Sequence, residues 1–391
     1  MLEVFCVFLR LGLTSFGGPI AHLGYFRNEF VVRRKWLGEE EYADLVALCQ
    51  FLPGPASSQV GFSLGVIRGN GILGGLAAWA GFTLPSAVLL VAFAFGATAF
   101  SGVVGTGVLH GLKLVAVAVV AQALWGMAPN LTPDRSRVGI ALVSVGIVTL
   151  AGGMFSQIAA ILCGALVGLW LGTGEQVRPQ ARLHVPVSSF SGGVALLVFV
   201  SIFLILTLAV WATGVQALVL FGAFYRSGAL VFGGGHVVLP LLQAQVVAPG
   251  WVSGETFLTG YGLAQAVPGP LFTFAAYLGA VVQVGPNGVS GALIALVGIF
   301  LPGLLLVYGM LPYWDALRAR PLAQAAMRGA NAAVVGILAA ALYNPVWTSA
   351  VHSATDFALA LAGFLLLVVW KLQPWIVVIL MASSAAILAI F

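Results

Sequence analysis

The sequence predicts an all-α polytopic membrane protein in which two inverted-topology repeats are joined by one extra transmembrane helix. Composition, an internal repeat and the placement of basic residues each contribute to this prediction. Of 391 residues, 61% are hydrophobic and 7% are charged, whereas a soluble domain carries roughly 25% charged residues. The mean hydropathy is +1.09. Apolar runs of about 20 residues, the length that crosses a bilayer, recur along the chain.

The second half of the chain repeats motifs of the first half about 215 to 218 positions later. Arg10 and Phe16-Gly17-Gly18 return at the same spacing as Arg226 and Phe232-Gly233-Gly234. The further matching pairs are Trp36 and Trp251, Glu40 and Glu255, Gln50 and Gln265, Pro53-Gly54-Pro55 and Pro268-Gly269-Pro270, Gly81 and Gly298, Leu84-Pro85 and Leu301-Pro302, and Gly111 and Gly329. An offset that drifts by single residues is typical of an old duplication.

Basic residues in the short loops indicate that the two repeats are inverted. Cytoplasmic loops carry an excess of Lys and Arg. The loops of the first half carry Arg27, Arg33, Arg34, Lys35, Arg68, Arg135 and Arg137, whereas their counterparts near 248–254, 283–288 and 345–354 carry none. The loop at 101–107 is uncharged, and its counterpart at 313–321 carries Arg318 and Arg320.

This charge pattern divides the chain and sets its orientation in the membrane. We expect an N-terminal repeat at 1–172, a cytoplasmic linker at 173–193, a connecting transmembrane helix at 194–213 and an inverted C-terminal repeat at 214–391. The N-terminus is expected inside and the C-terminus outside.

Proline and glycine predict breaks in the apolar helices. Pro-Gly-Pro cannot continue a helix, and broken backbone inside lipid is tolerated only where protein or water surrounds it. Each repeat should therefore contain two re-entrant helical hairpins, including 2–23, 40–67 and 215–247, with a full crossing at 2–23 as the structural alternative. The expected hairpin breakers are Pro19, Pro53, Pro55, Pro268 and Pro270. About four crossings complete each repeat, near 72–100, 102–128, 138–153 and 155–172, and near 288–311, 322–345, 354–370 and 373–391.

The broken segments have the composition of an anion site near the middle of the membrane. Paired broken helices in two halves point to a transporter's binding site, and half-helix N-termini attract anions. Glycine lets backbone N–H groups approach a ligand, and hydroxyls and amides add donors. The candidate substrate-binding residues of these kinds are Gly17, Gly18, Gln50, Gly54, Ser57, Ser58, Gly233, Gly234, Gln265, Gly269 and Thr273.

Two arginines at equivalent positions are the sharpest candidates. A charge near the bilayer centre costs a few kcal/mol or more, and a guanidinium can donate two parallel hydrogen bonds to an oxyanion. Arg10 and Arg226 therefore either contact the ligand or reach headgroups and hairpin carbonyls as structural residues. His236 and Lys113 are weaker candidates for the same site.

Several functional classes lack their sequence signatures. The chain has no metalloprotease, serine-hydrolase or nucleotide-binding motif, so neither an enzyme nor a cofactor is expected. Its three cysteines have no metal-ligand spacing, and its net charge of +5 lies mainly in loops, which argues against a nucleic-acid partner. The expected partners are an anion and the lipid bilayer, and a glycine-rich membrane protein of this kind is compatible with a homodimer.

At these motifs the chain resembles the chromate ion transporter (CHR) family in its long, two-domain form. The resemblance is carried by Arg10, by Phe16-Gly17-Gly18-Pro19, by Trp36 and by the segment from Gln50 to Pro55, together with their second-half counterparts. It implies a carrier that exports chromate across the cytoplasmic membrane and confers chromate resistance, with sulfate as a similar dianion. One departure is Gly235, which stands where the first copy has Pro19. Two alternatives stay open: a carrier or channel for sulfate or another anion, and a membrane scaffold that transports nothing.

Overall fold

The computed structural model describes residues 1–96, 102–151, 153–172, 185–232, 235–318 and 320–390, and these contain helices and connections but no strand. The predicted all-α class is therefore confirmed. The helices of the first half are α1 (Leu2–Thr14), α2 (Gly18–Phe26), the π-helix η1 (Arg27–Arg33), α3 (Glu39–Phe51), α4 (Ala56–Arg68), α5 (Ile72–Gly96), α6 (Val103–Leu131), α7 (Arg135–Ala151) and α8 (Gly153–Leu171).

The second half follows α9 (Ser189–Thr213) and presents a similar series. It consists of α10 (Gln216–Ala229), η3 (Gly235–Val237), α11 (Val238–Leu242), η4 (Gln243–Val247), α12 (Gly254–Ala264), η5 (Leu271–Thr273), α13 (Phe274–Val281), α14 (Gly288–Met310), η6 (Leu311–Tyr313), α15 (Trp314–Arg318), α16 (Pro321–Ala341), η7 (Leu342–Trp347), α17 (Ala354–Val368) and α18 (Pro374–Leu388).

The connecting helix begins earlier than the sequence predicts. α9 starts at Ser189, inside the segment assigned to the linker, because the Ser188 hydroxyl accepts a hydrogen bond from the Ser191 backbone N–H and caps the helix. The greater part of that linker, 173–184, lies outside the described residues.

Among the described residues, five helical stretches are long and apolar enough to cross a membrane: Ile72–Gly96, Val103–Leu131, Ser189–Leu206, Gly288–Leu317 and Pro321–Trp347. The chain is thus a multi-pass membrane protein. The other expected crossings are shorter: α17 and α18 have 15 residues each. At 1.5 Å per residue such a helix is about 22 Å long, less than the ~30 Å hydrocarbon core.

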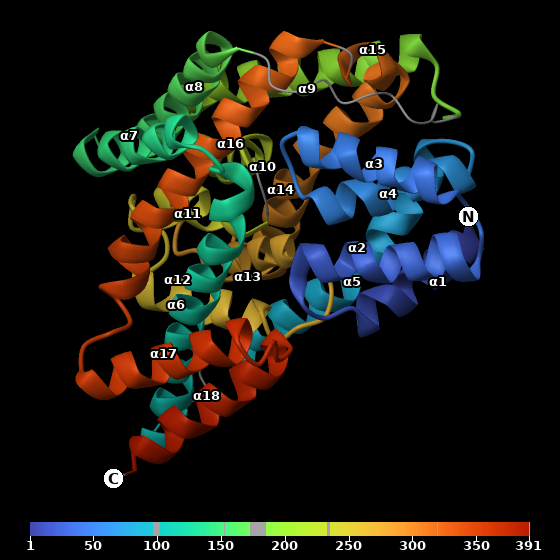
Figure 1. Ribbon diagram of the computed structural model, residues 1–391. Helices are drawn as coiled ribbons and strands as arrows, with labels where there is room; N and C mark the ends of the chain where they lie inside the picture. Colours follow the sequence, from blue (N-terminus) through green and yellow to red (C-terminus); the bar gives the residue numbers. More distant parts are fainter. Residues whose placement is uncertain (97–101, 152, 173–184, 233–234, 319, 391) are drawn as a thin grey trace.

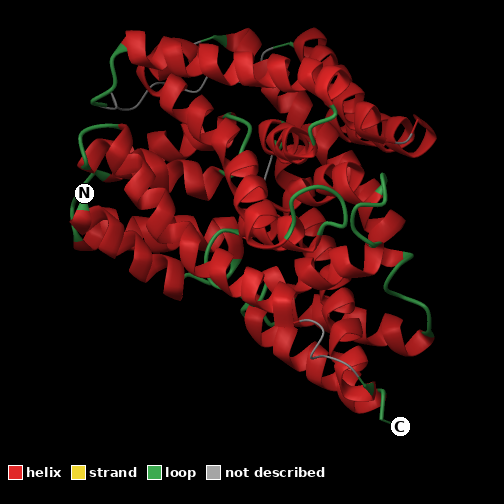
Figure 2. Cartoon of the chain, turned by 180° about the vertical axis from the view of Figure 1, so that it is seen from behind, coloured by secondary structure: helices red, strands yellow, loops and turns green. Residues whose placement is uncertain are grey.

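The same packing relations recur in the two halves (Figure 1). α1 and α4 pack on α5, as α10 and α13 pack on α14. The last pair of helices of each half packs on a long helix of the other half: α7 and α8 lie against α16, and α17 and α18 lie against α6. The view from behind shows helices joined by loops throughout the part of the chain that the structure describes (Figure 2).

Close helix packing at equivalent positions depends on glycine. A Cβ on Gly12 of α1 would lie 2.7 Å from the Phe82 carbonyl oxygen on α5. A Cβ on its counterpart Gly228 of α10 would overlap with the Ile299 carbonyl oxygen on α14. These approaches bring backbone against backbone, which small residues allow in membrane proteins.

The helices break at the repeated motifs. α3 ends before Leu52, Gly54 has φ +129°, and α4 begins at Ala56. The segment 2–23 is likewise interrupted, since α1 ends at Thr14, and Gly17 and Gly18 both have positive φ. These are backbone conformations that favour glycine.

Candidate functional site

The four helix breaks meet in two reciprocal hydrogen bonds that link the halves. The Gly54 N–H donates to the Val231 carbonyl at 2.7 Å, and the Gly269 N–H donates to the Ser15 carbonyl at 2.9 Å. Gly54 and Gly269 hold the same place in the two Pro-Gly-Pro motifs, and Ser15 and Val231 immediately precede Phe16 and Phe232. Each Pro-Gly-Pro tip is therefore held by the broken helix of the other half.

Both tips lie against equivalent points on the long helices. A Cβ on Gly54 would lie 3.0 Å from the Gly303 Cα on α14, and a Cβ on Gly269 would lie 2.8 Å from the Ser86 Oγ on α5. Ser86 and Gly303 each follow the matching Leu-Pro pair of their helix by one residue. The glycine of each tip is therefore required both by its positive φ and by space.

The second half has Gly235 where the first half has Pro19, and this difference has a steric reason. A Cβ on Gly235 would lie 2.9 Å from the Pro19 Cγ, so these two equivalent positions face each other across the junction of the halves. There is room for only one proline ring at this point.

A glutamine that sequence reasoning missed fixes the first tip. The Gln59 Nε2 donates to the carbonyls of Pro53 and Gly303, at 3.0 Å each. A single buried amide four residues after Pro-Gly-Pro is the signal that could have identified it, because it lies one helical turn beyond the break. Its second-half counterpart is Phe274, so the second tip has no such amide.

The hydroxyls next to the tips differ between the halves. Ser57 and Ser58 are buried in the first turn of α4. The Ser57 Oγ lies 3.5 Å from the His22 Nδ1, and the Ser58 Oγ has no hydrogen-bond partner among the described residues. In the second half, the Thr273 Oγ1 donates to the Pro270 carbonyl at 2.7 Å.

The structure places the two repeated arginines in different environments. Arg226 is partly buried on α10, its Nη2 lies 3.4 Å from the Gln245 Oε1, and its Nε is buried without a partner in the described part of the chain. The Arg10 side chain is exposed on α1. The two repeated glutamines differ in the same way as the arginines. Gln265 of the second half is buried, and its Nε2 has no partner among the described residues, whereas Gln50 of the first half is exposed.

The weaker candidates bind other protein groups. The His236 Nδ1 lies 2.7 Å from the Tyr261 hydroxyl, and the Lys113 Nζ forms an ion pair of 3.1 Å with the Glu255 carboxylate. The predicted residues Gly233 and Gly234 lie outside the described residues. Within the described ranges no group of three His, Cys, Asp or Glu side chains could hold a metal ion.

The sequence profile of the family described as "Chromate transporter" matches residues 2–169 and residues 218–387. This protein belongs to the chromate transporter family. It is 28% identical to a chromate transport protein of Pseudomonas aeruginosa, over 98% of this chain and 91% of that protein. It is 29% identical to a probable chromate transport protein of Synechococcus elongatus (95% and 92% covered) and 27% identical to a chromate transport protein of Cupriavidus metallidurans (95% and 89% covered). No solved structure gives a significant match.

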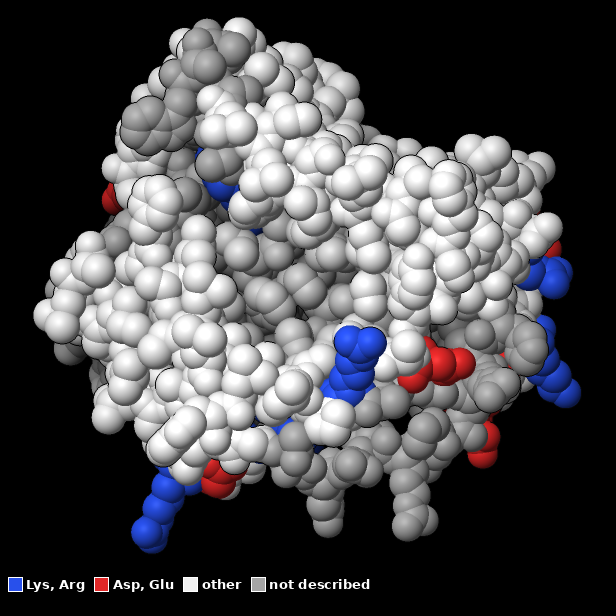
Figure 3. All heavy atoms as spheres, turned by 90° about the horizontal axis from the view of Figure 1, so that it is seen from above, with Lys and Arg blue, Asp and Glu red and all other residues white. Residues whose placement is uncertain are grey.

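The two stretches that match the chromate transporter family contain the four breaks, so the reciprocal contacts are formed between family-typical segments. Seen from above, the molecule is hollowed near the middle of one face, with Lys or Arg atoms visible at the edge of the hollow (Figure 3). Basic groups at the rim of a hollow raise the local concentration of anions.

A charged network lies at the edge of the first half. The Glu29 carboxylate accepts hydrogen bonds from Arg33 and Arg34, at 3.0 and 2.6 Å, and Glu3 pairs with Arg34 and Arg68. Partial burial pushes the pKa of Glu29 upward, but hydrogen bonds from the two guanidinium groups outweigh it and hold the pKa below its ordinary value.

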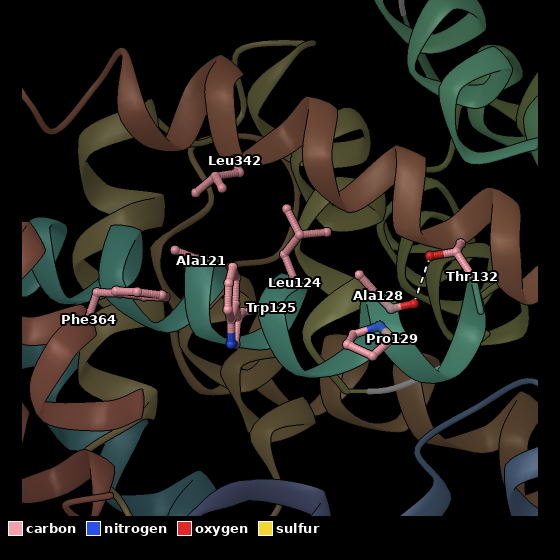
Figure 4. A pocket seen from close by; sticks show the side chains of 8 residues that line it. All are labelled: Ala121, Leu124, Trp125, Ala128, Pro129, Thr132, Leu342 and Phe364. Carbon is pink, nitrogen blue, oxygen red and sulfur yellow. Dashed lines mark hydrogen bonds between the residues drawn. The ribbon is translucent and has the colours of Figure 1, made fainter. Parts of the chain in front are cut away.

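A separate, apolar groove has a volume of about 510 Å³ (Figure 4). It is lined by Ala121, Leu124, Trp125, Ala128, Pro129, Thr132, Leu342 and Phe364. The Thr132 hydroxyl is bonded to the Ala128 carbonyl at 2.7 Å. A groove with so few free polar groups does not suit a charged oxyanion, and none of the candidate substrate-binding residues lines it.

Proposed function

We propose that this protein is a secondary transporter that exports chromate across the cytoplasmic membrane and thereby gives chromate resistance. Chromate is the substrate named for the relatives from Pseudomonas aeruginosa and Cupriavidus metallidurans. The observation that carries the proposal is the pair of reciprocal bonds, Gly54 N–H to Val231 and Gly269 N–H to Ser15. Because each tip is held by the opposite half, a relative movement of the halves would open one tip and then the other, as alternating access requires.

The substrate site is proposed at this crossing. Chromate is a tetrahedral dianion, as sulfate is, and such an ion requires donors on all sides. Arg226 and Gln265 have buried N–H groups without partners among the described residues, and α4 presents the N–H groups of its first turn. We also assign ligand contact during the transport cycle to the other predicted residues, namely Arg10, Gly17, Gly18, Gln50, Gly54, Ser57, Ser58, Lys113, Gly233, Gly234, His236, Gly269 and Thr273.

Electrical potential favours export of such an ion. Moving one charge through 100 mV is worth about 2.3 kcal/mol, so expelling a dianion from a negative interior is favoured by about 4.6 kcal/mol. This energy corresponds to a gradient of about a thousandfold, without ATP.

The topology of the proposal is the inverted one. The segments 2–23, 40–67 and 215–247 are re-entrant hairpins, the linker is cytoplasmic, the N-terminus lies inside and the C-terminus outside. The loops rich in Lys and Arg support this orientation. A C-terminal fluorescent fusion that folds only in the cytoplasm should stay dark, and an N-terminal fusion should be bright. A bright C-terminal fusion would contradict the inverted arrangement.

Uptake into everted vesicles tests the transport proposal. Vesicles carrying the protein should accumulate chromate faster than empty vesicles, and excess sulfate should reduce the rate. If nitrate or chloride competed as well as sulfate, the protein would instead carry monovalent anions. If uptake equalled that of empty vesicles, the scaffold alternative would hold.

A further inference from the structure

We propose that the first half holds an uncharged oxyanion subsite at the N-terminus of α4, formed by the hydroxyls of Ser15, Ser57, Ser58 and Thr83 together with the His22 ring. This hydroxyl cluster deepens the proposed function and rests on it. Ser15, Thr83 and His22 are not among the ligand residues assigned above.

The contacts bring four elements together around this point. His22 on α2 lies 3.5 Å from the Ser57 Oγ on α4, and its ring centroid lies 5.2 Å from that of Phe82 on α5. Thr83 is the next residue on α5. The Ser15 carbonyl, in the break between α1 and α2, binds the Gly269 N–H, so the tip from the second half closes the cluster.

The side chains of the cluster are buried, and several of their polar atoms have no partner among the described residues. Ser15, His22, Ser58 and Thr83 are at most 2% exposed. Within the described part of the chain, no hydrogen bond is made by the Oγ atoms of Ser15 and Ser58, by the Thr83 Oγ1 or by the His22 Nε2. A buried polar atom left unpaired costs about 1–3 kcal/mol, and such atoms are rare in native structures. Unpaired polar atoms on the elements that meet around the His22 ring indicate a polar ligand that enters and leaves.

The second half provides an internal control, because most of the equivalent side chains there are apolar. Only Ser58 has a hydroxyl as its counterpart, that of Thr273, and the Thr273 Oγ1 donates to the Pro270 carbonyl. At the repeat offsets of 215 to 217, Ser15 corresponds to Val231, Ser57 to Phe272 and Thr83 to Phe300. His22 corresponds to a valine at either of the offsets that apply there. If these polar groups only served the fold, the second half would need them too.

The two halves also differ in the helix that follows each Pro-Gly-Pro motif. The first intrahelical bond of α4 runs from the Gln59 N–H to the Pro55 carbonyl, so the three N–H groups before it, those of residues 56–58, carry the positive end of the helix dipole. In the second half the equivalent position is a 3₁₀ turn, and the Thr273 N–H is bonded to the Pro270 carbonyl. The anion-binding helix end therefore belongs to the first half.

A triple variant, Ser15→Ala/Ser58→Ala/Thr83→Val, tests the hydroxyl cluster. It removes three hydroxyls that make no hydrogen bond to the described residues, so thermal stability of the purified full-length protein should be unchanged or slightly higher. Chromate affinity, measured by titration with sulfate as competitor, should fall at least tenfold, because each hydrogen bond to a charged group contributes about a factor of ten or more. The matched control, Ser144→Ala/Thr149→Val, removes hydroxyls that bond to carbonyls of their own helix α7 and should bind chromate as the intact protein does.

Each result of this experiment has a separate meaning. If the stable triple variant keeps its chromate affinity while the intact protein transports chromate, the subsite proposal is wrong, and the unpaired atoms bind only water. The proposed function is then unaffected. If the intact protein neither binds nor transports chromate or sulfate, both proposals fail. If the triple variant loses stability, the hydroxyls are structural, and the subsite is again overturned. The single variant Ser58→Ala is a second test, and it should show a smaller loss of chromate affinity at unchanged thermal stability.

Discussion

The two Pro-Gly-Pro tips have the same backbone role but different surroundings. Gly54 and Gly269 donate equivalent hydrogen bonds to the opposite half. Buried hydroxyls lie near both tips, but the first tip is held by Gln59, whereas the second tip has Phe274 at that position. The comparison shows that the duplication preserved the crossing of the halves, while side chains around it diverged. Symmetry is therefore a good guide to the fold and a poor guide to which residues bind the ligand.

The largest effect should come from forcing the halves to be identical at their contact. Gly235→Pro would place a second proline ring where Pro19 already lies, since even a Cβ there would be 2.9 Å from the Pro19 Cγ. Overpacking of this kind costs about 3 kcal/mol, so we expect little folded protein in the membrane by fluorescence size-exclusion chromatography.

The exchange Pro19→Gly/Gly235→Pro should restore part of the folded protein, because one ring again occupies the space. Failure of the exchange to restore any would mean that the steric contact is not the reason for the asymmetry.

The next effect should separate the two arginines. Arg226→Gln should lower chromate flux about ten- to a hundredfold, because a charge-assisted hydrogen bond is worth about 1.5–3 kcal/mol. Arg10→Gln should have a smaller effect, because that side chain is exposed. Flux into everted vesicles, normalised to the amount of protein, measures both. Equal losses of chromate flux in the two variants would mean that Arg10 and Arg226 have equivalent roles.

A moderate effect is expected from Gln59→Leu. This change removes two hydrogen bonds of 3.0 Å to the Pro53 and Gly303 carbonyls and should lower stability by about 2 kcal/mol. Phe274→Leu at the equivalent position of the second half removes no hydrogen bond and serves as the comparison. Thermal unfolding of the two variants in the same detergent should differ by several degrees. A Gln59→Leu variant as stable as Phe274→Leu would show that the amide does not hold the tip.

The smallest effect concerns acid. The folded-state pKa of Glu29 is lowered by its arginine neighbours, so its contribution to stability is present above the ordinary glutamate pKa of about 4.3 and is lost as pH falls through the lower, folded value. Glu29→Gln should therefore flatten the acid side of a stability–pH profile and leave the neutral region less stable. If the stability of Glu29→Gln falls with acid as steeply as that of the intact protein, Glu29 does not contribute to the acid dependence.

Much of the fold could be predicted because short sequence motifs identify the helix breaks and the repeat. Pro-Gly-Pro locates the end of α3 and the start of α4 without any tertiary information. The crossing of the halves could not be predicted, since the contact of Gly54 with Val231 joins residues far apart in sequence. Gln59 was missed as part of the site for the same reason, because its role depends on which helix packs beside it. Apolar composition also overestimated helix length at α17 and α18, where run length and helix length differ.

The exchange of helix pairs between the halves constrains biosynthesis. α7 and α8 are made well before α16, the helix against which they pack, and roughly 150 residues of chain separate them. The first half therefore leaves the ribosome with a face that cannot yet be covered, and its final packing must wait for the second half. Contacts of such long sequence separation slow folding. We expect this protein to mature in the membrane as one late, joint assembly rather than as two domains folded in turn.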